Sequence, residues 1–322
     1  MDLIANNIKF SYLMIRLLVL LSILPSIVSA KPVQESVQIS FIVSQRSESY
    51  TQVVAAIRRD LPAEGYIYQT IHQDSIDSNY RQIASSDIVI TVGASATEAV
   101  MRQKPNFKIL AVLITDSAFS SLAKKYFGSR EAALGAGISV VCLDQPLQRS
   151  IELAKLLLPD ATVAGLMLGP AAHKHAEVFA RQISSAGMTP NIARFATQQN
   201  PILVIEPVLS QSDIFIPIPD TRLINIATAK WILQLSYRHR VPVIAYSKAY
   251  LKGGALAALY SSPEDVGRQT AELISHHFLS PSVNSGAHMP TYFSVDFNDS
   301  VAAFFNLDIK TADFYINKLA AD

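Results

Sequence analysis

Two short loops hold the residues of this chain that are best suited to bind a ligand. One reads Gly93-Ala94-Ser95-Ala96-Thr97 and the other Pro219-Asp220-Thr221, and each follows a short apolar run and precedes an apolar pattern of helical period. Small residues let a ligand approach the backbone, and unpaired N–H groups at the start of a helix favour an anionic group such as a carboxylate. The carboxylate of Asp220 suits a ligand ammonium group. The two loops therefore predict the binding of a small charged molecule.

Seven further candidates follow other apolar runs and carry hydroxyl, carboxyl, aromatic or imidazole groups: Ser44, Ser47, Tyr50, Thr115, Asp116, His173 and Tyr246. Asp116 suits a ligand ammonium group in the same way as Asp220, and the two tyrosines suit an aromatic wall. Each group also has an ordinary structural alternative. The Gly93 loop can be a tight turn chosen for packing, the aspartates can cap helices, and the tyrosines can belong to the core.

Patterns typical of catalysis or metal binding are weak. Gly93-x-Ser95 resembles half of a nucleophile elbow, but Thr97 stands where that motif has its second glycine. His173-x-His175 and His276-His277 lack further Cys, His or acidic residues at the spacings of zinc sites, so a solvated helix face explains them better. We therefore expect no catalytic residue, no metal and no cofactor.

Strand-like and helix-like segments alternate along the chain and must hold these loops. Short apolar runs rich in β-branched residues predict strands, and apolar residues spaced three to four apart predict helices. The expected strands include 37–43, 66–71, 88–92, 109–114, 138–143, 162–168, 189–195, 243–246, 255–260 and 291–297. Such alternation predicts an α/β fold with parallel sheets, in which ligands bind beyond the carboxyl ends of the strands.

One pattern of the chain occurs twice. Residues 86–101 and 212–229 both consist of an apolar run, a loop of small or polar residues and a helical pattern. A strand of the buried type follows each of them, at 107–112 and at 241–246. In both halves, a turn of small residues and a further helical pattern follow that strand. Three matched segments in one order predict two similar lobes.

Length and charge limit the class of protein. The chain has 322 residues, 50% of them hydrophobic, and its 27 Lys and Arg balance 26 Asp and Glu. This length is typical of two domains with large cores, and the near-zero net charge gives no support for binding to nucleic acid. We expect a monomer whose partners are a small-molecule ligand and a membrane protein.

The first 30 residues have the pattern of a signal peptide. Lys9 and Arg16 precede an apolar run over 17–28, and Val28-Ser29-Ala30 is similar to a signal-peptidase site. The run is shorter than the about 20 residues of a transmembrane helix, although an uncleaved anchor is the alternative. Cys142 is the only cysteine, so no thiol lies near the cleavage point for lipid attachment. We expect an exported, unlipidated, soluble protein of the periplasm, cleaved after Ala30.

One stretch resembles a known family. Lys252-Gly253-Gly254-Ala255-Leu256-Ala257-Ala258-Leu259-Tyr260, followed by Asp265-Val266-Gly267-Arg268-Gln269-Thr270-Ala271, is similar to the characteristic segment of ABC-transporter substrate-binding proteins of the kind that bind aromatic amino acids. Supporting matches are Leu157-Leu158-Pro159-Asp160-Ala161, Gly165-Leu166-Met167, Asp220-Thr221, Val241-Pro242-Val243 and Asn306-Leu307-Asp308-Ile309. The resemblance covers nearly all of the mature chain.

This resemblance implies the type I periplasmic binding protein fold, in which two α/β lobes close over a small molecule. It also implies a ligand carboxylate at Gly93 to Thr97 and further contacts from Thr115, Asp116 and Asp220. Because no Gly/Ser-rich linker separates the halves, we expect strands to cross directly between the lobes near Leu143, Ser261 and Pro290. The expected lobes are 31–143 with 262–290, and 144–261 with 291–322.

The function expected from these observations is that of a periplasmic solute-binding protein. It would capture a small carboxylate-bearing ligand, such as an amino acid, and deliver it to an ABC importer. One alternative is a ligand sensor that signals to a membrane kinase or cyclase, and another is an exported hydrolase that uses Ser95. The chain departs from the family pattern at Ser117, where Pro often follows the aspartate, at Ile138-Ser139 in place of Thr-Gly, and in lacking a lipid-attachment cysteine.

Overall fold

The computed structural model describes residues 36–45, 47–62, 64–196, 198–220, 223–278 and 286–320. The expected signal peptide and the candidate site residue Thr221 lie outside the described residues. Within these ranges, no helix is both long enough and apolar enough to cross a membrane.

The first sheet has six strands in the order β11-β5-β4-β3-β1-β2, and all neighbours are parallel. Its strands are β1 (Val37–Val43), β2 (Tyr66–His72), β3 (Ile88–Val92), β4 (Ile109–Ile114), β5 (Ile138–Cys142) and β11 (Ala287–His288). Every residue of β3 is buried, because Ile88 and Ile90 pack on one face of the sheet and Val89 packs on the other. The apolar run that predicted β3 thus marks a strand covered on both faces.

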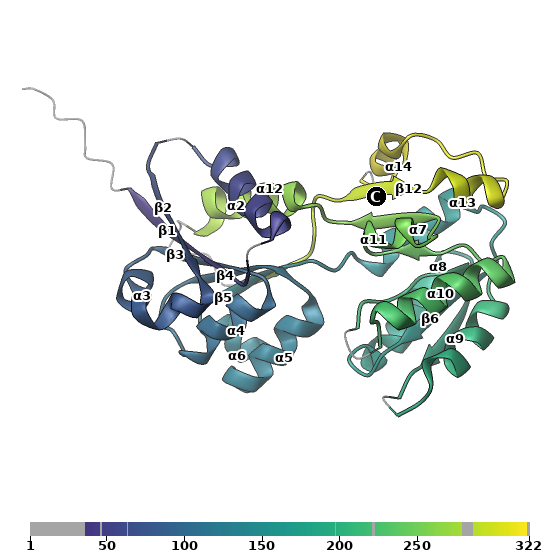
Figure 1. Cartoon of the computed structure of the whole chain (residues 1–322), viewed down its shortest axis with the longest axis horizontal. Helices are drawn as coiled ribbons and strands as arrows, with labels where there is room; N and C mark the ends of the chain where they lie inside the picture. Colours follow the sequence, from purple (N-terminus) through teal and green to yellow (C-terminus); the bar gives the residue numbers. More distant parts are fainter. Residues whose placement is uncertain are drawn as a thin grey trace, which may run out of the picture. The chain divides into compact units, whose positions relative to one another are not determined.

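Helices cover both faces of this sheet. The helices α2 (Glu48–Asp60) and α12 (Pro263–Leu273) pack side by side on one face, as Figure 1 shows. The other face is covered by α3 (Ile76–Ala84), which the 3-10 turn η1 (Gln73–Ser75) precedes, α4 (Ala94–Arg102), α5 (Asp116–Phe127) and α6 (Arg130–Gly135). The segment from Phe119 to Arg130 is divided between two helices, because Gly128 ends α5 at φ +87° and Ser129 caps α6.

The second sheet is built from two groups of strands, β12-β10-β9 and β7-β6-β8. A parallel bridge between Phe215 and Val243 joins β8 to the segment that leads into β9. The strands are β6 (Val163–Leu168), β7 (Thr189–Arg194), β8 (Ile214–Phe215), β9 (Ile244–Ala245), β10 (Ala257–Tyr260) and β12 (Ser294–Phe297). Only the pairing of β12 with β10 is antiparallel among these described pairs.

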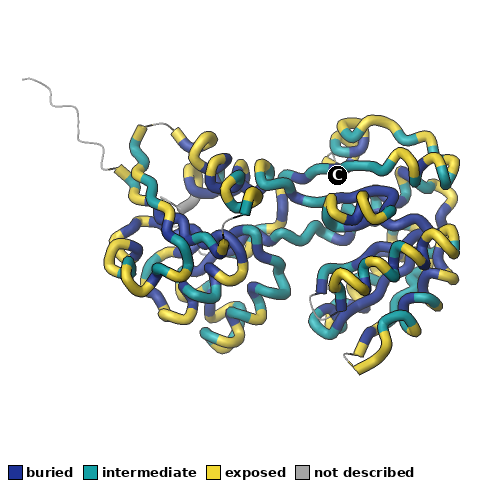
Figure 2. The backbone as a smooth tube through the Cα atoms, viewed as in Figure 1, coloured by how far each residue is buried: buried dark blue, intermediate teal, exposed yellow. Residues whose placement is uncertain are grey.

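Two groups of helices enclose the second sheet, so buried strands lie beneath helices with exposed outer faces (Figure 2). One core contains residues of α7 (Leu147–Leu157), α8 (Ala176–Ser185), α13 (Asp299–Phe304) and α14 (Ala312–Leu319). The other contains residues of α9 (Pro201–Ser210), α10 (Ile226–His239) and α11 (Ala249–Lys252). The 3-10 turn η2 (His173–His175) precedes α8, and a π-helical turn, η3 (Ile274–Phe278), extends α12.

The structure confirms the duplication and the two-lobed α/β fold. The strand order β2-β1-β3-β4-β5 of the first sheet recurs as β7-β6-β8-β9-β10 in the second. Helix α7 follows β5 in sequence but packs in the core of the second sheet, whereas α12 follows β10 and packs in the core of the first. The chain therefore crosses between the lobes after β5, after β10 and between β11 and β12.

Candidate functional site

The loops that follow β1, β3, β4 and β5 begin at the same edge of the first sheet, because these strands are parallel. They carry Ser44, Gly93, Thr115 and Asp144 respectively. Three of these four positions were expected from the sequence. Asp144 was not.

Gly93 brings two of the other expected residues together. Its φ of +93° lies in the region that favours glycine, and a Cβ atom built on it would lie 2.6 Å from Ser44 Oγ and 2.8 Å from Tyr50 Oη. Ser44 and Tyr50 therefore pack directly against the turn between β3 and α4. A side chain at position 93 would have to displace both of them.

The first turn of α4 leaves two backbone amides available. Ser44 Oγ accepts a hydrogen bond from Ala96 N at 2.8 Å and donates one to Val92 O at 3.0 Å. Ala94 and Ser95 are exposed, and no acceptor for their N–H groups exists within the described residues. Two N–H groups at the positive end of a helix form a site suited to a carboxylate.

Two other expected residues have structural partners. Thr97 is fully buried, and its hydroxyl donates to Gly93 O at 3.0 Å while lying 2.9 Å from Thr91 Oγ1. Ser47 caps α2 by accepting from Tyr50 N at 3.5 Å. Both residues shape the loops that carry the exposed amides and Tyr50.

A bulge at the end of β4 sets the position of Thr115 and Asp116. The register with β5 shifts between Ala111 and Ile114, and Leu113 has a φ of +52° that a branched residue rarely adopts. Thr115 Oγ1 then caps α5 by accepting from Ala118 N at 3.3 Å. The alternative of a capping role therefore applies to Thr115 and not to Asp116.

Asp116 forms an ion pair that sequence reasoning missed. Its Oδ1 accepts a hydrogen bond from Arg130 Nη1 and lies 3.7 Å from Cys142 Sγ. Arg130 is also held by Ser120, whose Oγ lies 2.9 Å from Nη1. A basic residue 14 positions along the chain gives no local sign of this pairing. The negative charge of Asp116 is thus balanced within the protein.

Asp144 is the acidic residue at this edge that lacks a positive partner. Its Oδ2 accepts a hydrogen bond from Asp116 N at 2.5 Å, and no ion pair to it occurs within the described residues. Burial raises its pKa to about 6; the hydrogen bond from Asp116 N opposes this rise, and the charge of Asp116 adds to it. Like Asp116, Asp144 is a polar residue that comes after an apolar strand, and this position in the sequence could have identified it as a candidate site residue.

Asp220 is fixed in the second lobe. It is 3% exposed, and its Oδ2 accepts a hydrogen bond from Ala171 N at 3.0 Å. A Cβ atom on Gly169 would lie 2.3 Å from the same oxygen, so the loop after β6 wraps closely around this carboxylate. His173 lies in that loop, with Nε2 3.1 Å from Leu168 O. Asn225, and not Asp220, caps α10.

Tyr246 belongs to a pair of tyrosines after β9. Its hydroxyl lies 3.0 Å from that of Tyr250, and the two ring centroids are 5.2 Å apart. Burial raises the pKa of Tyr246, and the charges of Tyr250 and Asp144 add to this shift. The electrostatic coupling to Asp144 links this loop of the second lobe to the strand ends of the first.

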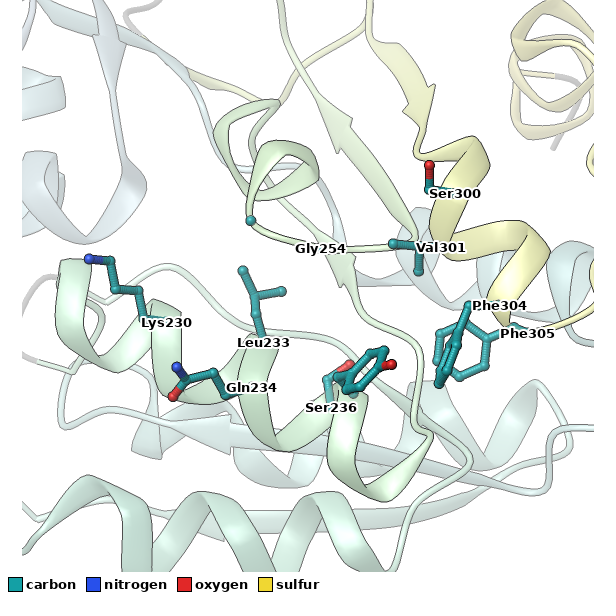
Figure 3. Close-up of a pocket in the computed structure, with 11 residues that line it drawn as sticks. Lys230, Leu233, Gln234, Ser236, Gly254, Ser300, Val301, Phe304 and Phe305 are labelled. Carbon is teal, nitrogen blue, oxygen red and sulfur yellow. The ribbon is translucent and has the colours of Figure 1, made fainter.

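A hollow of about 560 Å³ lies away from these loops, between α10, the turn at Gly253–Gly254 and α13 (Figure 3). Its wall includes Leu233 and Phe304, and Phe304 stacks on Tyr237 with a centroid distance of 4.6 Å. None of the candidate residues lines it. In the part of the chain that the structure describes, no group of three or more His, Cys, Asp or Glu is placed to hold a metal ion.

Two matched α/β lobes with polar loops at their strand ends define a fold that solved structures share. The ligand-free, open structure of CD0873, a substrate binding protein from Clostridium difficile, aligns with a TM-score of 0.64 and 15% identity over 85% of this chain and 96% of that one. An ABC domain from Streptococcus pneumonia in complex with L-Trp gives 0.57 and 15% over 88% and 98%. A conserved domain protein from Vibrio cholerae gives 0.55 and 14% over 88% and 98%.

These likenesses establish the type I periplasmic binding protein fold. The family model for ABC transporter substrate binding proteins matches residues 64–279, which is more than half of the chain, and the chain belongs to that family. No curated protein matches the sequence. The fold and the family expected from the sequence are thus confirmed.

Proposed function

We propose that this protein is the solute-binding component of an ABC importer and that it captures a small amino acid-like molecule between its lobes. The single observation that carries the proposal is the start of α4, where the N–H groups of Ala94 and Ser95 are exposed and lack an acceptor within the described residues. Such a pair of amides suits a ligand carboxylate.

Asp144 supplies the second half of the proposed recognition. Asp116 already pairs with Arg130, and Asp220 already accepts from Ala171 N. Asp144 is desolvated and lacks an ionic partner in the described chain, so a ligand ammonium group would relieve the cost of its charge. A carboxylate at α4 and an ammonium group at Asp144 together describe a zwitterion. Tyr50, Tyr246 and Tyr250 would then contact its side chain.

Closure follows from contacts to both lobes. A ligand held at α4 and at Tyr246 gains its full set of contacts only when the lobes approach, so binding favours the closed state that a permease would recognise. Export by the N-terminal segment, cleavage after Ala30 and the lobe boundaries near Leu143, Ser261 and Pro290 form part of the same proposal.

Isothermal titration calorimetry with matched ligands tests the proposed binding of an amino acid. L-tryptophan, tryptamine and indole-3-propionate share a ring but differ in the carboxylate and the ammonium group, and corresponding trios test other amino acids. We expect at least one complete amino acid to bind and both of its truncated analogues to bind at least about tenfold more weakly. Absence of binding by every member, or equal binding by an amine and its parent amino acid, would contradict the proposal.

A variant at the first helical position tests the α4 site directly. Ala94→Pro deletes one N–H group, and proline is tolerated at this position because Gly93 has an extended ψ of 160°. Ala312→Pro is the matched control, since Ala312 is the first residue of α14 and follows Thr311 at ψ 153°. We expect Ala94→Pro to weaken binding by about tenfold and Ala312→Pro to leave it unchanged.

A further inference from the structure

Hydrogen bonds connect the three segments that cross between the lobes. The first crossing leads from β5 to α7 and carries Gln145, the second carries Ser261 between β10 and α12, and the third runs from Pro290 to Phe293. Gln145 Nε2 donates to Ser261 Oγ at 2.7 Å, and Ser261 Oγ donates to Tyr292 O at 3.3 Å. One serine hydroxyl thus bridges all three crossings.

Arg149 forms a second connection between the first and third crossings. Its Nη1 donates to Gln145 Oε1 at 2.5 Å and to Pro290 O at 3.2 Å, and its guanidinium carbon lies 4.1 Å from the ring centroid of Phe293. Burial lowers the pKa of Arg149, the charge of Glu152 opposes this shift, and no ion pair of Arg149 occurs within the described residues. A partly buried guanidinium without a direct ion pair depends on these acceptors and on the ring.

Helix α12 holds the third crossing from the side of the first lobe. Gln269 is 6% exposed; its Nε2 donates to Met289 O at 2.8 Å, and its Oε1 accepts from Thr291 N at 3.0 Å. Asp265 Oδ2 accepts from Ser262 N and from Ser294 Oγ, each at 2.8 Å. The third crossing is therefore anchored to α12, and the bonds of Gln145, Arg149 and Ser261 decide how the other two crossings lie against it.

Rotation of one lobe about this region must change these bonds. Hydrogen bonds weaken steeply beyond about 3.5 Å and below about 120°, so the bridging serine cannot keep both of its partners through a large rotation. We propose that Gln145, Arg149 and Ser261 form a hinge cluster that sets the balance between lobe orientations and thereby tunes ligand affinity without touching the ligand. The effect on affinity rests on the proposed function, whereas the effect on lobe orientation does not.

Distances between spin labels in the ligand-free protein test the inference. Labels at Ala132→Cys on α6 and Glu177→Cys on α8 occupy exposed positions on the two lobes, and the native Cys142 is buried. We expect Ser261→Ala and Gln145→Ala to shift or broaden the distance distribution and Ser261→Thr to restore it. Unchanged distributions in both alanine variants would overturn the inference.

Tyr292→Phe is the matched control. It removes the hydrogen bonds from Tyr292 Oη to Glu272, at 2.7 and 2.9 Å. These bonds connect the third crossing only to α12. The variant keeps the Tyr292 carbonyl oxygen that accepts from Ser261. We expect this variant to lower the midpoint of urea unfolding without changing the distance distribution. A change equal to that of Ser261→Ala would show general loosening and would overturn the role of the hinge cluster.

Titration with whichever amino acid binds completes the test. Loss of one such bond is expected to change the dissociation constant by about fivefold. A shifted distance distribution in a protein that binds no amino acid would support the hinge cluster and reject the proposed ligand class. A shifted distribution with unchanged affinity would reject the coupling to ligand binding.

Discussion

The hydroxyl oxygen of Tyr50 lies so close to Gly93 that a Cβ atom at position 93 would come within 2.8 Å of it. Ser44 Oγ would be closer still, at 2.6 Å, and the φ of Gly93 is +93°. We expect Gly93→Ala to lower the free energy of unfolding by at least about 2 kcal/mol, because backbone strain and steric overlap add. Urea unfolding followed by circular dichroism measures this.

Gly128→Ala separates the two causes. Gly128 has a similar φ of +87°, but a Cβ atom there would meet nothing within 4 Å. Gly128→Ala therefore introduces backbone strain without steric overlap, and we expect it to lower the free energy of unfolding by about 1 kcal/mol. Equal costs for the two variants would show that the contacts of Gly93 with Ser44 and Tyr50 contribute nothing.

Asp144→Asn is expected to stabilise the free protein at high pH. The folded-state pKa of about 6 exceeds the ordinary aspartate value of 3.8, so the charged carboxylate is penalised in the folded protein above pH 6 and the penalty fades as the pH falls towards 4. We expect a gain in the free energy of unfolding of about 2 kcal/mol at pH 8 and almost none at pH 4. Chemical unfolding at both pH values measures this difference.

Asp213→Asn provides a control of opposite sign. Burial acts to raise the pKa of Asp213, but hydrogen bonds from Thr162 and Val163 outweigh it and lower the pKa. Its stabilising contribution is present above the unfolded-state pKa and is lost as the pH falls through the folded-state pKa. We therefore expect Asp213→Asn to destabilise the protein at pH 8. If both asparagine variants shift stability in the same direction, the burial argument for Asp144 is wrong.

Two substitutions of Asp220 distinguish a structural role from ligand contact. Asp220→Ala leaves the partly buried N–H group of Ala171 without its acceptor, and we expect a loss of about 1 to 2 kcal/mol in the free energy of unfolding. Asp220→Asn retains an acceptor oxygen and should keep most of the stability. A tenfold loss of ligand affinity in a stable Asp220→Asn protein would instead assign the negative charge to ligand binding.

The thiol of Cys142 should be unreactive in the folded protein. It is fully buried, and burial raises its pKa to about 12, with the charge of Asp116 adding to the shift. We expect no reaction with an aromatic disulfide reagent at pH 8 and one thiol per chain after unfolding. Rapid reaction without denaturant would contradict the burial of this strand end.

The sequence by itself determined the elements and their duplication. β1, β3 and β4 have the bounds that their apolar, β-branched runs predict, because strand periodicity is a local property of consecutive residues. Helix starts depend on single capping residues as well as on periodicity: α2 begins at Glu48 because Ser47 caps it. The glycine at position 93 was also identified, since a tight strand-to-helix turn has a local composition.

The tertiary structure alone decided which candidate side chains are available. Asp116 pairs with Arg130, and Thr97 is fully buried. The hydroxyl of Ser44 accepts a hydrogen bond from the N–H group of Ala96, which lies 52 residues away in the sequence. The neighbouring residues in the sequence give no indication of these partners, because the parallel sheet brings the loops together only after each strand has paired with its neighbours. That Asp144 has no ion pair within the described residues has the same cause, since its environment depends on how distant segments pack around it.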